Sequence, residues 1–281
     1  MSGHSVTERE LRPGLFASQP LPGVFQLRST VGVEVCGTLL VGGSEALLVD
    51  TQLGFTDLAG AVREITELPL TVILTHGHID HCCGCGAFPE VYADKADIDD
   101  ARLQMGDANI RGRLLRMAAP NLPEAFSKEE WSAWRGENLR ELRPGAGFEL
   151  GGLSARTIPI RTHSPGSVCV FCPERELLLG GDAVSPMCCL AIPGACSVSE
   201  HLNALETLRE LPFRHLLSGH SARLIPRDEL ETYIQCARSI DPKQSTRYRD
   251  PIFPEYPGLL YCCNSQGGAA AAIMYTMDRL S

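Results

Sequence analysis

The sequence predicts an α/β fold in which two β-sheets pack face to face with helices on their outer sides. The chain has two halves, and in each half strand-like segments come first and helical segments follow. Several of the strand-like segments are short and fully apolar, which is typical of strands buried on both faces. With 281 residues, 44% of them hydrophobic, the chain can bury a large core. We expect residues 1–281 to form one domain, although this length also suits two.

The first half begins with several strands and one helix. Residues 23–50 consist of Val- and Leu-rich runs separated by glycine pairs, a pattern that predicts successive antiparallel strands. Apolar residues recur at helical spacing in residues 55–68, which predicts a helix. Residues 70–75, LTVILT, then form a short strand that we expect to be buried on both faces.

Residues 94–145 are expected to form a helical insertion within the fold. Their pattern is amphipathic, but it is interrupted by Pro120 and Pro123. The insertion carries both tryptophans, Trp131 and Trp134, and we expect it to cover the functional site as a lid. The alternative is that the two tryptophans only pack the insertion onto the rest of the fold.

The second half repeats the order of strands and helices. Its predicted elements are three strands in residues 153–184, a helix in 197–211, a strand in 213–220 and a helix in 226–240. Ser199 is the expected N-cap of the first helix, and Pro226 is expected in the first turn of the second. Residues 251–281 are too mixed in pattern to predict.

Charge and composition exclude several classes of protein. The formal net charge is -9 and no cluster of Lys and Arg occurs, so we expect no nucleic-acid partner. The first residues resemble no signal peptide, and no apolar run reaches membrane-spanning length. Twelve cysteines without a secretion signal indicate a reducing compartment. We therefore expect a cytoplasmic protein without a membrane segment.

A dense group of ligand-type residues follows the strand at residues 70–75. The segment HGHIDH places His76, His78, Asp80 and His81 within six residues. Imidazoles and a carboxylate this close together repel one another when protonated or share a cation, so the segment predicts a metal site. In an extended turn the first two histidines point the same way and can bind one ion, which leaves the other two residues for a second ion.

Three more ligand-type residues occupy similar positions. His163, Asp182 and His220 each lie at the end of a predicted strand, next to a glycine or a tight turn. Glycine allows the backbone to approach a metal closely. A single such residue is usually an ordinary turn residue, but the recurrence of the same position in four segments predicts a shared site.

Together these motifs resemble the metallo-β-lactamase superfamily of metallohydrolases over roughly residues 23–240. The resemblance implies a four-layer αβ/βα sandwich with metals along the edge between the two sheets. It also implies a role for each motif residue: His76, His78 and His163 hold a first metal, Asp80, His81 and His220 hold a second, Asp182 bridges both, and Asp50 orients the site.

The chemistry expected of such a site is hydrolysis. Two dications about 3.5 to 4 Å apart lower the pKa of a shared water from about 15.7 toward neutrality and produce a bridging hydroxide. We expect Asp80 to orient this nucleophile and to accept its proton. Nitrogen and oxygen ligands without thiolate favour two zinc ions, although manganese or iron would be tolerated.

Asp182 narrows the expected substrate. A bridging carboxylate resembles the branch of the superfamily that contains glyoxalase II-like thioesterases, lactonases and phosphodiesterases. We therefore expect a dinuclear metal hydrolase that cleaves a carboxylic ester, thioester or lactone of a small molecule. Hydrolysis of a small phosphodiester or phosphonate, iron-dependent redox chemistry and a binding protein with a relict site remain alternatives, and the sequence leaves a homo-oligomer open.

Several residues near the motifs are candidates for other roles. Trp131, Trp134 and Met187 are candidates for the lining of the substrate pocket. The cysteines in residues 82–85 are expected to be buried packing residues, since the metals already have nitrogen and oxygen ligands. His201 is expected to be a solvated residue in the first turn of a helix.

Overall fold

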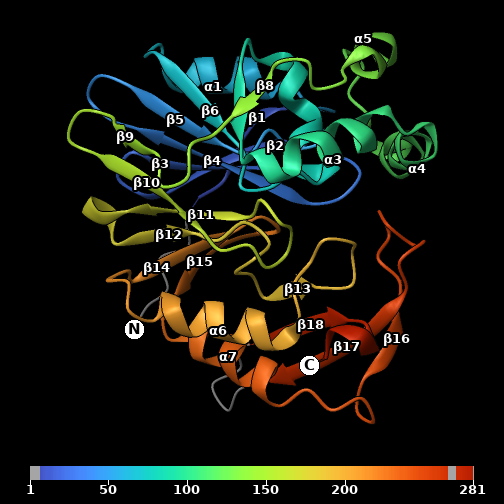
Figure 1. The fold of residues 1–281 in the computed structure, drawn as a ribbon. Helices are drawn as coiled ribbons and strands as arrows, with labels where there is room; N and C mark the ends of the chain where they lie inside the picture. The colour runs from blue at the N-terminus through green and yellow to red at the C-terminus, as the bar shows by residue number, and fades with distance from the viewer. Residues whose placement is uncertain (1–6, 265–269, 281) are drawn as a thin grey trace.

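Two large β-sheets lie face to face in the computed structural model, and helices cover their outer sides (Figure 1). The structure describes residues 7–264 and 270–280. The layers follow the order helix, sheet, sheet, helix, so the predicted four-layer αβ/βα arrangement is confirmed. No helix in the described ranges is long and apolar enough to cross a lipid bilayer.

The first sheet has eight strands that follow one another in chain order. Strands β1 to β5 pair antiparallel, and β5 to β8 pair parallel. Their bounds are β1 Arg9–Arg12, β2 Leu15–Leu21, β3 Val24–Ser29, β4 Val35–Val41, β5 Ala46–Val49, β6 Leu70–Ile73, β7 Val91–Ala93 and β8 Leu139–Glu141.

The second sheet has six strands in the order β15-β14-β12-β11-β10-β9. Of its described pairs, only β12–β14 is parallel. The bounds are β9 Gly147–Glu149, β10 Ser154–Pro159, β11 Val168–Cys172, β12 Leu177–Leu179, β14 His215–Ser218 and β15 Ser221–Pro226.

The helices lie on the outer faces of these sheets (Figure 1). Helices α1, α3 and α4 share an apolar cluster with the first sheet, and α6 and α7 share another with the second sheet. The bounds are α1 Leu58–Ile65, α2 Ile79–Cys82, α3 Lys95–Gly106, α4 Ala108–Ala118, α5 Lys128–Ala133, α6 Val198–Leu208 and α7 Glu229–Arg238, with short 3-10 turns at Cys83–Ala87, Ala119–Asn121, Pro173–Arg175 and Met277–Arg279.

Central strands are apolar at every position because both of their faces are buried. In β12, Leu177 and Leu179 point into the core between the two sheets, whereas Leu178 packs toward the helices. Strand β5 divides in the same way, with Leu47 facing the other sheet and Leu48 facing the helices. The period of two that places side chains on opposite faces therefore serves two different cores.

The C-terminal residues form a third sheet that the sequence pattern did not predict. Its order is β13-β18-β17-β16, and it lies beside α6 and α7 (Figure 1). Strand β13 comes from the middle of the chain and pairs parallel with β18. The bounds are β13 Met187–Cys189, β16 Thr246–Tyr248, β17 Gly258–Asn264 and β18 Ala270–Tyr275.

Two expected helix starts are wrong. Helix α6 is capped by Ser197, two residues before the expected Ser199, because the hydroxyl of Ser197 accepts from the backbone of Glu200 and the Glu200 carboxylate accepts in return from the Ser197 nitrogen. Pro226 ends β15 instead of starting α7. Strand β15 lies at the edge of its sheet, where a residue without an N–H is tolerated.

Residues 94–145 contain three helices and one strand. Helix α4 ends at Ala118, immediately before the 3-10 turn that contains Pro120. Strand β8 then pairs with β7 and extends the first sheet by one strand. The segment therefore also contributes to the sheet, in addition to the helices that the pattern predicted.

Candidate metal centre

The predicted ligand residues come together at one edge of the two sheets. His76 and His78 lie in the loop after β6, and Asp80 and His81 lie in the short helix α2 that follows. The remaining three residues come from the second sheet, where they follow β10, β12 and β14. Backbone hydrogen bonds join the two sheets here, from Val168 to Thr75 at 2.8 Å and from Cys36 to Gly219 at 2.7 Å.

A first group of donors contains three imidazoles. The ligand atoms of His76, His78 and His163 lie within 4.8 Å of one another, and all three side chains are buried. His78 Nδ1 is 2.8 Å from His163 Nε2. Three nitrogen donors that converge in this way can hold one transition metal ion.

A second group contains two imidazoles and two carboxylates. The ligand atoms of Asp80, His81, Asp182 and His220 also lie within 4.8 Å of one another. His220 Nε2 is 3.2 Å from Asp80 Oδ2 and 3.1 Å from Asp182 Oδ2. The Oδ2 atom of Asp182 is also 3.7 Å from His163 Nε2, a member of the first group, so Asp182 lies between the two groups.

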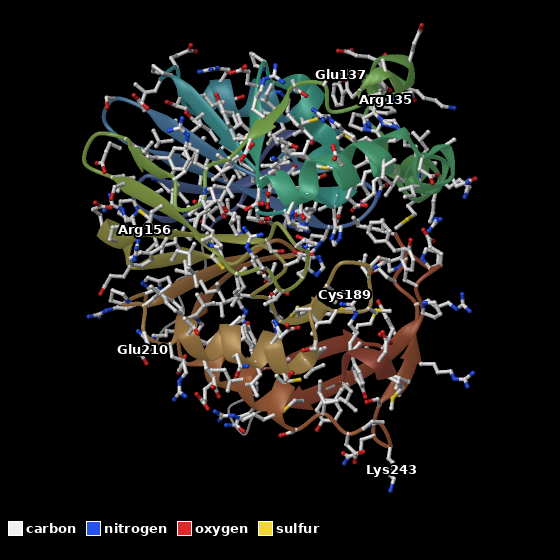
Figure 2. The ribbon with its side chains drawn as sticks, viewed as in Figure 1. Arg135, Glu137, Arg156, Cys189, Glu210 and Lys243 are labelled. Atoms are coloured by element: carbon white, nitrogen blue, oxygen red, sulfur yellow. The ribbon has the colours of Figure 1, made fainter. Side chains whose placement is uncertain are left out.

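Hydrogen bonds on the far side of three of the rings fix the orientation of these histidines. The Nδ1 atom of His81 is 2.9 Å from Asp50 Oδ2, and that of His220 is 2.6 Å from the backbone oxygen of Glu34. His163 Nδ1 is 2.7 Å from the backbone oxygen of Cys189, which lies on β13 (Figure 2). These contacts direct the Nε2 atoms inward, an arrangement typical of metal-binding histidines.

Asp50 connects both parts of the ligand loop. Its carboxylate accepts hydrogen bonds from the Thr75 backbone nitrogen at 2.7 Å and from the Thr75 hydroxyl at 2.8 Å, in addition to its contact with His81. Thr75 Oγ1 is in turn 3.0 Å from His76 Nδ1. Asp50 has a φ of 68°, which is unusual for a residue with a side chain and is found where the surrounding structure imposes it.

The pKa values of the histidines differ between the two donor groups. Burial, followed by the charges of neighbouring histidines, lowers the pKa of His76 well below its ordinary value and that of His78 to about 3. Burial also acts to lower the pKa of His81, but three carboxylates, with Asp182 first, raise it to about 10. The pKa of His220 is raised well above its ordinary value in the same way. His76 and His78 therefore offer neutral nitrogen donors, and the second group stabilises positive charge.

The donor set fits metal ions. Among the described residues, the buried Nε2 atom of His76 has no hydrogen-bond partner, and neither has the buried Oδ1 atom of Asp182, although His81 Nε2 lies 3.3 Å away. Buried polar atoms without partners are costly and require an explanation. A cation held by the surrounding nitrogen and oxygen atoms would satisfy both atoms.

An apolar cavity of about 250 Å³ opens directly onto these donors. Met187 lies in its wall, 36% exposed. The other wall residues outside the two donor groups are Val33, Ser185, Pro186, Cys189, Ile192, Tyr248, Asp250, Pro251, Ile252 and Phe253. The cavity therefore combines a polar floor with mostly apolar walls, which is typical of small-molecule sites.

Trp131 and Trp134, two candidates for the pocket lining, do not line this cavity. Trp131 is buried, donates a hydrogen bond from Nε1 to the Leu53 backbone oxygen at 2.8 Å, and packs against Phe55. Both tryptophans line a different hollow. Arg135, which follows Trp134, lies at the top of the molecule in Figure 2, far above Cys189. The rings pack the insertion onto the first sheet, because that sheet presents an apolar outer face.

The cavity is instead covered by residues 248–253, which the sequence pattern did not identify. Asp250 Oδ1 accepts hydrogen bonds from the backbone nitrogens of Ile252 and Phe253 at 2.8 and 3.0 Å. Arg113 of α4 donates to the Ile252 backbone oxygen at 2.5 Å. The insertion therefore supports the covering loop from outside. The only sequence signal was the Asp-Pro pair, which favours a turn but indicates no ligand.

His201 differs from its expected environment, and Asp97 has contacts that the sequence pattern did not indicate. His201 is buried, not solvated, and burial lowers its pKa to about 4. Asp97 of α3 is also buried and contacts both loops that carry the first donor group. The cysteines of residues 82–85 are buried, and burial raises their pKa values, as expected for packing residues.

Comparison with known proteins identifies the family. The family model described as the metallo-beta-lactamase superfamily matches residues 33–220, more than half of the chain. A chicken (Gallus gallus) protein named acyl-coenzyme A thioesterase MBLAC2 is 25% identical over 230 residues, which cover 73% of this chain and 80% of that protein. Its human (Homo sapiens) counterpart is 25% identical over 206 residues, covering 64% and 71% of the two chains.

Solved structures agree with this assignment. A metallo-beta-lactamase family protein from Thermus thermophilus is 25% identical, with a TM-score of 0.55 and coverage of 76% of this chain and 78% of that chain. A metallo-beta-lactamase from Erythrobacter litoralis is 15% identical, with a TM-score of 0.56 and coverage of 83% and 100%, and shows the fold alone. With the two donor groups, these matches confirm the expected metal-dependent hydrolase. The chain belongs to the metallo-beta-lactamase superfamily.

Proposed function

We propose that the protein hydrolyses acyl thioesters, with acyl-coenzyme A as the substrate class to test first. The observation that carries this proposal is the apolar cavity that opens directly onto the two donor groups. Apolar walls suit an acyl chain, and the polar floor suits the thioester carbonyl. The proposal is supported by the two vertebrate relatives, which are named acyl-coenzyme A thioesterases.

The metal centre is proposed to hold two zinc ions. The donors are imidazole nitrogens and carboxylate oxygens without thiolate, a set that suits zinc and also accepts manganese or iron. Bound there, the ions would polarise the substrate carbonyl and lower the pKa of a water molecule toward neutrality. The proposed ligands are His76, His78 and His163 for one ion, Asp80, His81 and His220 for the other, and Asp182 for both.

Asp80 is proposed as the residue that orients the nucleophile and accepts its proton. Its carboxylate lies in the cavity floor, and its Oδ2 atom is held 3.2 Å from His220 Nε2. Burial would raise the pKa of Asp80, but His81 and His220 lower it, so the carboxylate is ionised at neutral pH. An ionised carboxylate beside the reacting carbonyl can accept a hydrogen bond and then the proton.

A panel of substrates tests this function. Initial rates would be measured for an acyl-coenzyme A, a homoserine-type lactone, an aryl ester and an aryl phosphodiester, each with and without chelator. We expect the thioester to be cleaved fastest, with activity lost in chelator and in Asp80→Ala and Asp182→Ala. Activity that persists in both variants would exclude the mechanism, and preference for the phosphodiester would exclude the thioester assignment.

Metal analysis tests the dinuclear zinc centre independently of turnover. We expect about two zinc ions per chain in the purified protein, and fewer in His163→Ala. A matched control is His215→Ala, because His215 lies on β14 outside both donor groups. One ion per chain, or iron in place of zinc, would contradict the proposed centre.

A cytoplasmic location and a single domain are also proposed. All twelve cysteines are free thiols, and most of them are buried among apolar residues, as suits a reducing compartment. The apolar core between the two large sheets draws residues from both halves of the chain, which supports one domain. Imaging of a tagged protein and a single cooperative unfolding transition are the corresponding tests.

A further inference from the structure

A second hollow lies at one end of the C-terminal sheet. It has a volume of about 520 Å³, and its lining includes Arg247, Tyr248 and Arg249, which lie on β16 or directly after it. Among the described residues, no carboxylate side chain lines it. The hollow therefore presents two guanidinium groups in a protein whose formal net charge is -9.

Neither arginine is neutralised by an acidic neighbour. Within residues 7–264 and 270–280, no ion pair involves Arg247 or Arg249. The side chain of Arg249 donates a hydrogen bond to the Pro254 backbone oxygen at 3.0 Å, which leaves its charge uncompensated. Other arginines of the chain, such as Arg28 and Arg223, pair with glutamates. The two arginines of the hollow are thus available to an anion from solution.

The hollow and the cavity at the metal centre share one lining residue. Tyr248 lines both spaces, and it is half-buried between the two exposed arginines. Met277, which also borders the hollow, is 59% exposed and adds an apolar surface to it. A ligand that extended from the cavity past Tyr248 would therefore meet positive charge together with an apolar surface.

We propose that Arg247 and Arg249 bind the phosphate groups of the coenzyme A part of the substrate, while the acyl end occupies the cavity at the metal centre. This inference rests on the proposed thioesterase function. The guanidinium group matches phosphate oxygens in shape and charge. The exposed side chain of Met277 provides an apolar surface for the adenine base. The pantetheine part of the substrate would then span the distance past Tyr248, so that the thioester reaches the donor groups.

A comparison of two substrates with the same acyl group tests the proposal. Acyl-coenzyme A carries the phosphates, and the corresponding acyl-pantetheine lacks them. For the variant with both Arg247→Ala and Arg249→Ala, we expect the KM for acyl-coenzyme A to rise about tenfold, as for the loss of charge-assisted hydrogen bonds. The KM for acyl-pantetheine and kcat for both substrates should stay the same. Lysine at both positions should recover part of the loss.

A matched control and salt dependence sharpen the test. Arg143→Ala removes an exposed arginine between β8 and β9, far from β16 in Figure 1, and should change neither KM. The KM for acyl-coenzyme A should increase with salt in the wild type, and less so in the double variant. Equal effects on both substrates, or no effect on either, would overturn the proposal.

Direct titration with coenzyme A separates this proposal from the proposed function. If the wild type cleaves neither thioester, the proposed function fails. The titration then tests the hollow by itself. Binding of coenzyme A to the wild type that is lost in the double variant supports a site for its phosphates. Absence of binding to the wild type overturns the proposed site.

Discussion

The Oδ2 atom of Asp97 accepts a hydrogen bond from the backbone nitrogen of Gly77 at 2.9 Å. The same atom accepts a second from the Ser164 hydroxyl at 2.6 Å, and Oδ1 accepts a third from the backbone nitrogen of Gly166 at 2.7 Å. Gly77 lies between two candidate ligands in the loop after β6, and the other two partners follow a candidate ligand in the loop after β10. One buried carboxylate therefore holds together the loops from the two sheets that form the first donor group.

Replacing this carboxylate by an amide is expected to weaken metal binding. In Asp97→Asn, one amide oxygen can still accept, but the NH₂ group must face a donor of Gly77 or Gly166, so one loop is released. We expect zinc affinity to fall about 10- to 100-fold, as for other residues that support metal ligands. Zinc competition with a chelator measures this, and added zinc should restore part of the activity.

Asp99→Asn is the matched control for this prediction. Asp99 lies on the same helix, its side chain is 95% exposed, and it forms an ion pair with Arg102 at 3.7 Å. Its zinc affinity should equal that of the wild type. A lower melting temperature of Asp97→Asn without any change in zinc affinity would show that Asp97 stabilises the fold but does not position ligands.

A methyl group at Gly219 is expected to disrupt the second donor group. A Cβ atom at this position would lie 2.4 Å from Asp182 Oδ1 and 2.5 Å from His81 Cε1, which is closer than atoms can pack. Gly219→Ala should therefore displace both side chains, lower zinc content and remove most activity. Gly106→Ala is the control, since no described atom lies within 4 Å of the Cβ at Gly106. Normal zinc content in Gly219→Ala would contradict the geometry.

The strands and the candidate ligands that follow them could be predicted, because the local sequence pattern determines both. The loop after β6 follows a strand that is apolar throughout most of its length, and the ends of such strands meet at one edge of a sheet. The recurrence of His163, Asp182 and His220 after other strands could therefore be interpreted jointly. The sandwich followed from the same strands, whose apolar residues serve two cores.

Contacts between distant segments could not be predicted from local pattern. Asp97 looks like any polar residue of the mainly polar helix α3, and only the approach of two loops buries it. Residues 248–253 have neither periodicity nor ligand-type spacing, and they reach the cavity because the third sheet forms. Strand β18 is rich in alanine, a good helix former, and extends only because it pairs with β13 and β17.

Substitutions at Trp131 and Phe253 should separate stability from substrate binding. Trp131 is buried in the insertion and lies outside the cavity lining, so Trp131→Ala should reduce the free energy of unfolding by about 3 to 5 kcal/mol without a change in KM. Phe253 lies in the cavity wall with its ring 5.5 Å from that of His78, so Phe253→Leu should raise KM. Denaturant unfolding and steady-state kinetics measure the two effects. A raised KM in a folded Trp131→Ala variant would show instead that Trp131 contributes to substrate binding.

The buried His201 is expected to make the folded protein less stable in mild acid. Burial, followed by the charge of His163, lowers the pKa of His201 from its ordinary value of 6.5 to about 4. Between these pH values the unfolded chain binds a proton that the folded chain excludes. The contribution of His201 is therefore fully present above about pH 6.5 and is lost as the pH falls toward 4, by about 3 kcal/mol at most.

Comparison with a variant isolates this contribution from those of the other histidines. His201→Leu keeps an apolar side chain in the same environment, where Nδ1 of His201 has no hydrogen-bond partner among the described residues. The loss of unfolding free energy between pH 6.5 and 4 should be smaller in His201→Leu than in the wild type. An equal pH dependence in the wild type and in His201→Leu would mean that helix α6 opens locally and admits water at this position before the whole chain unfolds, because a hydrated histidine does not have the pKa lowered by burial.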